Sequence, residues 1–252
     1  HTPGYDLVVP EIARLGSHAA WMLQKWDDME TFLPDDLEPI EQLQQQKVLL
    51  VDSTSFYRTL LAIQRGNFTL ASDLIDETRA KLAGTISSLL NEGYKRAYPA
   101  MSTMQSLSEL EEIVEYKQAV AAINIRHEND REVMRKIDEE SGIGRKSRHS
   151  GTNSIASNNY DDSRQNEINI RKAALIQKWK GRLKWAPKEV PVYRQILAIR
   201  MMAIEPHETL DSWLELVKLC RDDGMNKLCE NVLFRLGASL PDTKSNTDYV
   251  GE

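Results

Sequence analysis

Residues 64–75 read QRGNFTLASDLI, and this stretch predicts two helices joined by a tight turn. Glycine at position 66 suits the turn because it adopts left-handed backbone angles without a steric penalty. Phe68 and Ala71 follow two and five residues after it, where side chains pack inside a helix pair, and Ile75 follows nine residues after it. A helix, a turn and a second helix that packs back on the first need this spacing.

The same spacing occurs at three other places in the chain. The further sets are Gln24/Trp26/Met29, Ser108/Leu110/Ile113 and Gly224/Asn226/Cys229, and the first and last continue to Leu33 and Leu233. Tandem hairpins of this kind are typical of tetratricopeptide-type repeats of about 34 residues. The predicted fold is therefore all-α, an irregular α-solenoid of tetratricopeptide-like helical hairpins.

Apolar periodicity extends the pattern beyond the turns. Residues 10–33 carry apolar side chains at a 3.6-residue rhythm, and residues 56–90 form a full hairpin. Two helices are predicted between residues 93 and 120, the second beginning at Ser106 or Ser108 with a capping box. The last hairpin is predicted over residues 208–237.

A polar stretch separates two helical blocks. Ser, Asn, Arg, Lys, Asp and Gly dominate residues 129–166, which therefore bury too little apolar area to offset their chain entropy. We expect disorder there, at least over residues 140–163. The predicted organisation is helical repeats over 1–128, a disordered polar insert over 129–166, helical repeats over 167–240 and a polar tail over 241–252.

Composition excludes several classes of protein. No apolar run approaches the roughly 18 residues of a membrane span, and the first residues lack the pattern of a signal peptide, so the chain reads as a piece of a longer protein. Cys220 and Cys229 fall on opposite helices of the last hairpin, at positions for small apolar residues. Both are interpreted as reduced core residues, which favours a cytosolic or nuclear compartment.

Sequence motifs of catalysis are missing. The phosphate-binding patterns GxxxxGK and GxGxxG and the kinase HRD and DFG signatures do not occur. The five histidines are scattered without the spacing of metal ligands, so no metal site is predicted. Carboxylate clusters are attributed to helix dipoles or solvent, and they are Asp27/Asp28, Asp35/Asp36 and Glu109/Glu111/Glu112. The segment itself is therefore not expected to be an enzyme.

One basic stretch runs against the net charge of the chain. Residues 171–200 hold nine Lys and Arg side chains and a single acid, Glu189, although the chain carries −6 overall. One interpretation is a solvated helix face with Trp179 and Trp185 as core anchors, and the other is a polyanion site. Nucleic acid is not expected as a partner, because the pI is near 5.5 and no binding module is present. Ser147 and Ser150 follow basic residues in RKSRHS and are candidate phosphorylation sites.

Three runs go beyond generic helical repeats. They are AAWMLQKWDDMETF (19–32), GYKRAYPAMSTMQSLSELEEIVEYK (93–117) and ILAIRMMAIEPHETLDSWLELVKLCRDDG (196–224). In content and order they resemble the FAT region of the target of rapamycin (TOR) kinases, which are phosphatidylinositol-3-kinase-like Ser/Thr protein kinases. Together with FYRTLLAI (56–63) they cover most of the chain outside the insert.

The resemblance implies a function. In that family the FAT region is a helical solenoid that lies before the rapamycin-binding and kinase domains, clamps the kinase and contributes to its regulation. The parent protein would be a Ser/Thr kinase that controls growth in response to nutrients. Its implied partners are the kinase domain and other helical repeats of the same chain, and TOR-complex subunits. The implied location is cytoplasmic, with peripheral attachment to endomembranes through the parent complex.

The resemblance also gives the basic stretch a ligand. Several FAT-containing kinases hold an inositol polyphosphate among lysines and arginines of this region, which implies inositol hexakisphosphate as a cofactor. The contributors expected in this chain are Lys178, Lys180, Arg182, Lys184 and Arg194, joined by Arg79 and Lys81 of the earlier hairpin. The alternative function is a stand-alone helical-repeat adaptor that binds peptide or protein partners in a concave groove. An enzyme acting alone ranks third.

Overall fold

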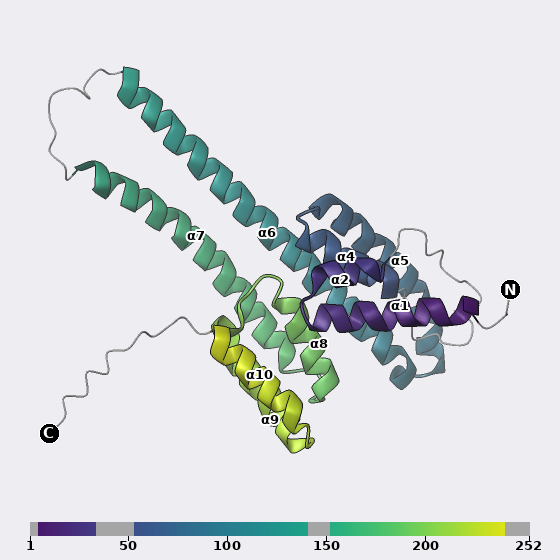
Figure 1. Cartoon of the computed structure of the whole chain (residues 1–252). Coiled ribbons are helices and arrows are strands. Elements are labelled where there is room, and N and C mark those ends of the chain that lie inside the picture. The colour runs from purple at the N-terminus through teal and green to yellow at the C-terminus, as the bar shows by residue number, and fades with distance from the viewer. Residues whose placement is uncertain (1–4, 34–52, 141–151, 240–252) are drawn as a thin grey trace, which may run out of the picture. The chain divides into compact units, whose positions relative to one another are not determined.

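The computed structural model describes residues 5–33, 53–140 and 152–239, and within these ranges every regular element is a helix (Figure 1). The all-α prediction is confirmed. The chain divides into two compact units, unit 1 at His1–Ile155 and unit 2 at Ala156–Glu252. Each unit is described by itself.

Unit 1 is built from helices that pack in chain order. Its elements are α1 (Tyr5–Met22), α2 (Trp26–Thr31), α4 (Ser53–Gln64), α5 (Phe68–Glu92) and α6 (Tyr94–Glu140). The contacts join α1 to α2 and α4, α4 to α5, and α5 to α6. Neighbours in sequence are thus neighbours in space, as in a stack of helical hairpins.

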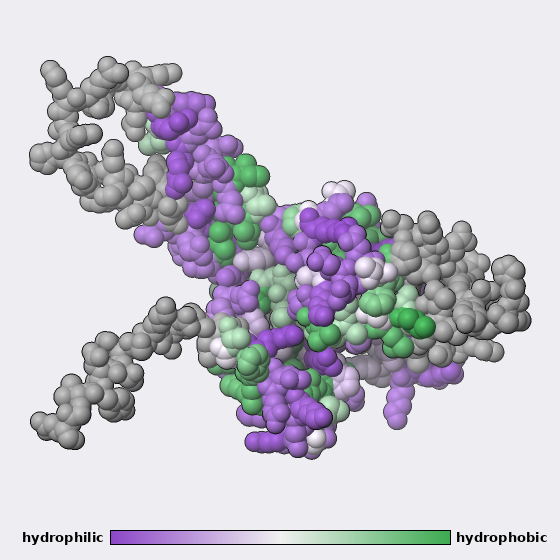
Figure 2. Space-filling model, viewed as in Figure 1, coloured by the Kyte–Doolittle hydropathy of each residue, from purple (hydrophilic) through white to green (hydrophobic). Residues whose placement is uncertain are grey.

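The described residues of unit 2 form four helices and a short 3₁₀ segment. They are α7 (Thr152–Leu183), α8 (Val190–Arg200), η2 (Pro206–Thr209), α9 (Leu210–Asp222) and α10 (Asn226–Ser239). Its core is a cluster of buried apolar side chains from all four helices, including Leu183, Tyr193, Leu216, Cys220 and Leu236. Figure 2 shows green areas interrupted by hydrophilic residues on the visible face of the α9–α10 pair.

Three of the four predicted turns are present and share one backbone geometry. Gln24, Gly66 and Gly224 have positive φ angles of 60°, 75° and 71°. The next residue donates its N–H five residues back, Lys25 to Ala20 at 2.9 Å, Asn67 to Ala62 at 2.9 Å and Met225 to Cys220 at 2.8 Å. This is the Schellman arrangement, which satisfies carbonyl groups at a helix end. One sequence pattern has therefore produced one turn three times.

The fourth predicted turn, at Ser108, was wrong. Ser108 lies inside α6, a continuous helix of 47 residues. Ser106 and Ser108 were expected to cap a new helix, but neither does. The Ser106 hydroxyl donates to the Ser102 carbonyl and the Ser108 hydroxyl to the Met104 carbonyl, each at 3.2 Å, as serines inside a helix do. Leu107 and Leu110 are fully buried on either side of Ser108, so the apolar stripe continues through it.

Helix also extends into the segment that was expected to be disordered. Residues 129–140 belong to α6 and residues 152–166 to α7, so disorder is wrong for both stretches. Ion pairs one turn apart support these polar helices, Glu132 with Lys136 at 2.9 Å and Glu167 with Arg171 at 3.7 Å. Residues 141–151 and the polar tail from residue 240 onward lie outside the described residues. The domain boundaries themselves stay a prediction.

Buried aromatic side chains hold α1 against α4 in unit 1. Trp21 is 1% exposed, and its ring centroid lies 5.7 Å from that of Phe56 and 6.2 Å from that of Tyr57. The Tyr57 hydroxyl oxygen is 3.1 Å from Nδ1 of His18. Burial raises the pKa of Tyr57 to about 12, against a smaller lowering by the Arg14 charge.

The raised pKa of Tyr57 predicts a loss of stability in alkali. A phenol whose pKa rises on folding stabilises the fold fully below the unfolded value of 10.0, and this contribution disappears as the pH rises through about 12. Two pKa units correspond to about 2.7 kcal/mol. Urea unfolding at about pH 9 and about pH 12 should show this loss in the wild-type chain and a smaller one in Tyr57→Phe. Equal losses in both proteins would contradict the assignment to Tyr57.

Candidate functional site

The predicted polyanion residues of unit 2 do not share one face. Lys178, Lys180 and Arg182 lie on α7, Lys184 directly after it and Arg194 on α8. Steps of two residues turn a helix by about 200°, so Lys178 and Arg182 share a side of α7 while Lys180 points to the opposite side. The basic stretch therefore presents separate groups of charge.

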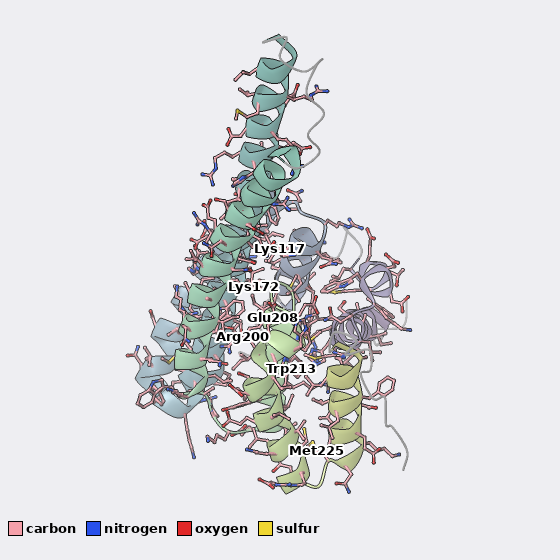
Figure 3. The ribbon with its side chains drawn as sticks, turned by 90° about the vertical axis from the view of Figure 1, so that its left-hand side faces the viewer. Lys117, Lys172, Arg200, Glu208, Trp213 and Met225 are labelled. Carbon is pink, nitrogen blue, oxygen red and sulfur yellow. The ribbon has the colours of Figure 1, made fainter. Side chains whose placement is uncertain are left out.

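Several of its lysines bind acids of the following helices. Lys172 Nζ lies 2.8 Å from Glu208 Oε1, Lys180 Nζ lies 3.1 Å from Asp211 Oδ2, and Lys188 Nζ lies 3.2 Å from Glu215 Oε1. Figure 3 shows Lys172 of α7 beside Glu208 of η2. Each of these two side chains is 25% exposed, so this pair is the best shielded of the three. Part of the basic stretch thus links α7 and the connection that follows it to η2 and α9.

Arg79 and Lys81, the predicted contributors from the earlier hairpin, belong to unit 1. Arg79 binds Glu111 of α6 at 2.7 Å and Asp76 at 3.3 Å, and Lys81 binds Glu77 at 2.8 Å. The candidate phosphorylation sites Ser147 and Ser150 lie outside the described residues. Binding of inositol hexakisphosphate by this set of residues stays a prediction.

The two tryptophans of the basic stretch have different environments. Trp179 is 1% exposed, and the Arg200 guanidinium carbon lies 5.4 Å from its ring centroid. Arg200 is itself only 5% exposed, so the cation–π contact is shielded from water. Trp179 is a core anchor as predicted. Trp185 is not, because it stands in the turn after α7 with 89% of its surface exposed.

Sequence reasoning missed two buried carboxylates on α6. Glu109 is 2% exposed and Glu112 is 8% exposed, so their assignment to solvent or a helix dipole was wrong. Gln105 Nε2 lies 3.4 Å from Glu109 Oε1. Both acids flank Leu110 and Ile113, whose helical spacing marks the buried face of α6 and was the available signal.

The described residues hold neither a metal-binding cluster nor a membrane-spanning helix. No group of three His, Cys, Asp or Glu side chains among residues 5–33, 53–140 and 152–239 could hold a metal ion. No helix in the same ranges is long and apolar enough to cross a membrane. Cys220 is a buried free thiol on α9 and Cys229 a partly buried one on α10, and burial raises the pKa of Cys220.

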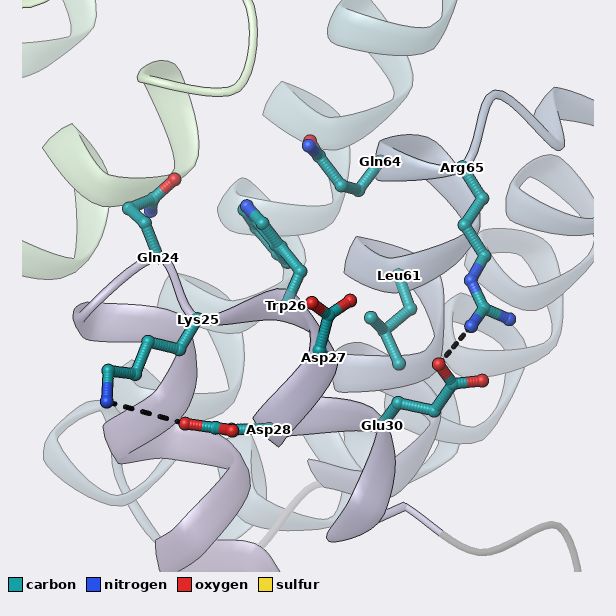
Figure 4. Close-up of a pocket in the computed structure, with 9 residues that line it drawn as sticks. All are labelled: Gln24, Lys25, Trp26, Asp27, Asp28, Glu30, Leu61, Gln64 and Arg65. Carbon is teal, nitrogen blue, oxygen red and sulfur yellow. Dashed lines mark ion pairs between the residues drawn. The ribbon is translucent and has the colours of Figure 1, made fainter.

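A cleft of ≈ 550 Å³ lies at the turn end of the α1–α2 hairpin, against the end of α4 (Figure 4). The residues that line it are Gln24, Lys25, Trp26, Asp27, Asp28, Glu30, Leu61, Gln64 and Arg65. Two ion pairs lie on its rim, Lys25 with Asp28 at 3.5 Å and Arg65 with Glu30. The cleft belongs wholly to unit 1.

Comparison with protein families identifies the chain. The family model of the FAT domain matches residues 13–140 and 153–250. The chain belongs to the FAT domain family. The family assignment made from the three sequence runs is confirmed, and the helical hairpins described above are the fold of this FAT segment.

The relatives of the FAT segment are TOR kinases from distant organisms. It is 27% identical to the serine/threonine-protein kinase mTor of Drosophila melanogaster over 235 aligned residues, and the alignment covers 92% of the chain. It is 25% identical over 248 residues to the serine/threonine-protein kinase TOR of Arabidopsis thaliana, covering 96% of the chain, and 25% identical over 226 residues to tor1 of Schizosaccharomyces pombe, covering 89%. The chain spans 7%, 8% and 7% of the length of these three proteins.

Proposed function

We propose that this chain is the regulatory scaffold of a TOR-type Ser/Thr protein kinase that controls growth in response to nutrients. The FAT match over most of the chain carries the proposal, because the relatives that share it are named as serine/threonine-protein kinases. The segment would clamp the kinase domain of the same chain and contact further helical repeats and TOR-complex subunits. We place the parent protein in the cytoplasm, with peripheral attachment to endomembranes through its complex.

The packing of unit 1 supports a mechanical role. α4, α5 and α6 pack in chain order, and Leu60, Ala71 and Leu110 are fully buried in these helices. Close-packed helices shift as bodies and do not deform continuously, so a change at one end of the stack alters the positions of helices further along. A kinase domain that rests on such a stack would respond to its curvature.

The test changes packing inside the segment and measures kinase activity elsewhere. In the intact parent protein, Leu60→Ala removes a fully buried side chain of α4, and Leu70→Ala removes a side chain of α5 that is 46% exposed. We expect Leu60→Ala to change the specific kinase activity at least twofold and Leu70→Ala to leave it unchanged. Unaltered activity in Leu60→Ala, with faster proteolysis confirming that the helices have loosened, would argue against the scaffold. A stable isolated chain that captures peptides would then favour the adaptor.

The polyanion site is proposed as a part of the same scaffold. Lys178 and Arg182 share a face of α7, and Lys184 is an exposed lysine beyond its end, which supports phosphate binding there. Calorimetric titration of the parent protein with inositol hexakisphosphate, against a variant with reversed charges at these positions, tests it. Binding that survives charge reversal would place the ligand elsewhere.

A further inference from the structure

The cleft between α2 and α4 contains one solvent-exposed carboxylate, in the first turn of α2, that no side chain of the described residues pairs with. Asp28 is paired with Lys25, and Glu30 is paired with Arg65. Asp27 also lines the cleft, and among the described residues it has no ion pair or hydrogen bond. The cleft therefore holds a net negative charge, centred on Asp27, that an approaching cation would neutralise.

Aromatic and amide groups stand beside this carboxylate. Figure 4 shows the Trp26 ring and the Asp27 carboxylate next to one another, both directed into the cleft, with Gln64 across from them. Gln24 Nε2 donates to the Trp21 carbonyl at 3.2 Å, which leaves its own side-chain oxygen as an acceptor at the edge of the cleft. The lining thus offers a ring, a carboxylate and amide oxygens within one space.

A guanidinium group matches this combination better than other cations. It is planar and stacks on an aromatic ring, and its five N–H donors satisfy a carboxylate and amide oxygens together. A lysine ammonium is a compact, strongly hydrated charge, which gains less from the ring. A cleft of ≈ 550 Å³ also has room for more than one side chain. A peptide segment that contains the arginine and the residues next to it therefore fits the cleft better than a free guanidinium.

We propose that the cleft binds an arginine-containing segment of a partner protein, with the arginine stacked on Trp26 and paired with Asp27. Leu61 supplies the apolar floor against which the methylene groups of the arginine pack. The proposal concerns this cleft alone and does not depend on kinase regulation by the segment.

The experiment uses the intact parent protein and two blocked five-residue peptides. Each peptide has glycines around a photoreactive benzoylphenylalanine, which is followed by arginine in one peptide and by the uncharged isostere citrulline in the other. Saturation-transfer NMR measures binding, and mass spectrometry locates the photochemical cross-links. We expect the arginine peptide to bind and to cross-link within residues 24–30 or 61–65.

Two matched variants distinguish a specific contact with Asp27 from a general effect of negative charge in the cleft. Asp27→Asn should weaken binding of the arginine peptide at least tenfold and abolish the cross-links, because a charge-assisted pair is lost. Asp28→Asn removes the neighbouring carboxylate, which is already paired with Lys25. It should leave the affinity for the arginine peptide and the yield of cross-links within about twofold of the wild-type values. Equal binding of the citrulline peptide, equal effects of the two variants, cross-links confined to other regions or no binding by the wild type would each overturn the proposal.

Discussion

Replacing Trp179 by alanine is expected to lower the free energy of unfolding by about 3–5 kcal/mol. The indole is 1% exposed, so its removal leaves a cavity in unit 2. It also takes away the ring over which Arg200, only 5% exposed, is held. A buried guanidinium would lose part of its compensation, which adds to the cost. Urea unfolding of the chain followed by circular dichroism measures the change.

Trp185 provides the control because the two residues differ in burial and not in type. With 89% of its surface exposed, Trp185 makes little packing that alanine could remove. Trp185→Ala should therefore change the unfolding free energy by about 0.5 kcal/mol or less. Similar losses for both variants would mean that Trp185 is buried in solution, and that the turn after α7 is not as described.

Replacing Ser108 by proline should cost about 3 kcal/mol or more. Ser108 lies within α6, where proline removes the hydrogen bond from its backbone N–H and clashes with the carbonyl of Met104. Had a second helix started at this point, proline would have been well tolerated in its first turn. Thermal unfolding of the variant thus discriminates a continuous α6 from the hairpin that the sequence pattern favoured.

Ser108→Ala separates the backbone effect from loss of the hydroxyl group. The hydroxyl donates only to the Met104 carbonyl, which the helix already uses, and alanine has the higher helix propensity. We expect the alanine variant to be as stable as the wild type or slightly more stable. If the proline variant melted at the same temperature as the alanine variant, the result would contradict a continuous α6 and favour a turn at residue 108.

The hairpin turns could be predicted because backbone chemistry decides them locally. Gly66 and Gly224 adopt left-handed angles at no cost. After Gly66 the predicted core positions Ala71 and Ile75 are buried, whereas after Gly224 Leu233 is 46% exposed and its neighbour Val232 is buried instead. Gln24 and Ser108 both carry the same spacing without glycine, yet Gln24 turns with φ 60° while Ser108 stays helical, so the turn residue alone does not decide. Burial of Leu107 and Leu110 against neighbouring helices then decides in favour of an unbroken helix, which is tertiary information that the local pattern lacks.

The candidate sites were harder to predict for the same reason. A count of charges located the basic stretch, but the partners of Lys172 and Lys180 lie more than 30 residues further along the chain, at Glu208 and Asp211. The cleft at Asp27 depends on α2 meeting the end of α4. The sequence predicted that Asp27 and Asp28 lie near a helix start, and they lie in the first turn of α2. It could not show which acid of the cleft would have no side-chain partner.

The length of α6 turns small rotations into large displacements. Side chains are buried along it as far as Ile123, and none of the described ones from there to residue 137 is buried. At 1.5 Å per residue, the stretch from Ile123 to the helix end at Glu140 reaches about 26 Å past the packed part. Tilting the packed part by about 5° would move that tip by about 2.2 Å, given this length. The helix is thus a lever whose fulcrum lies in the core of unit 1.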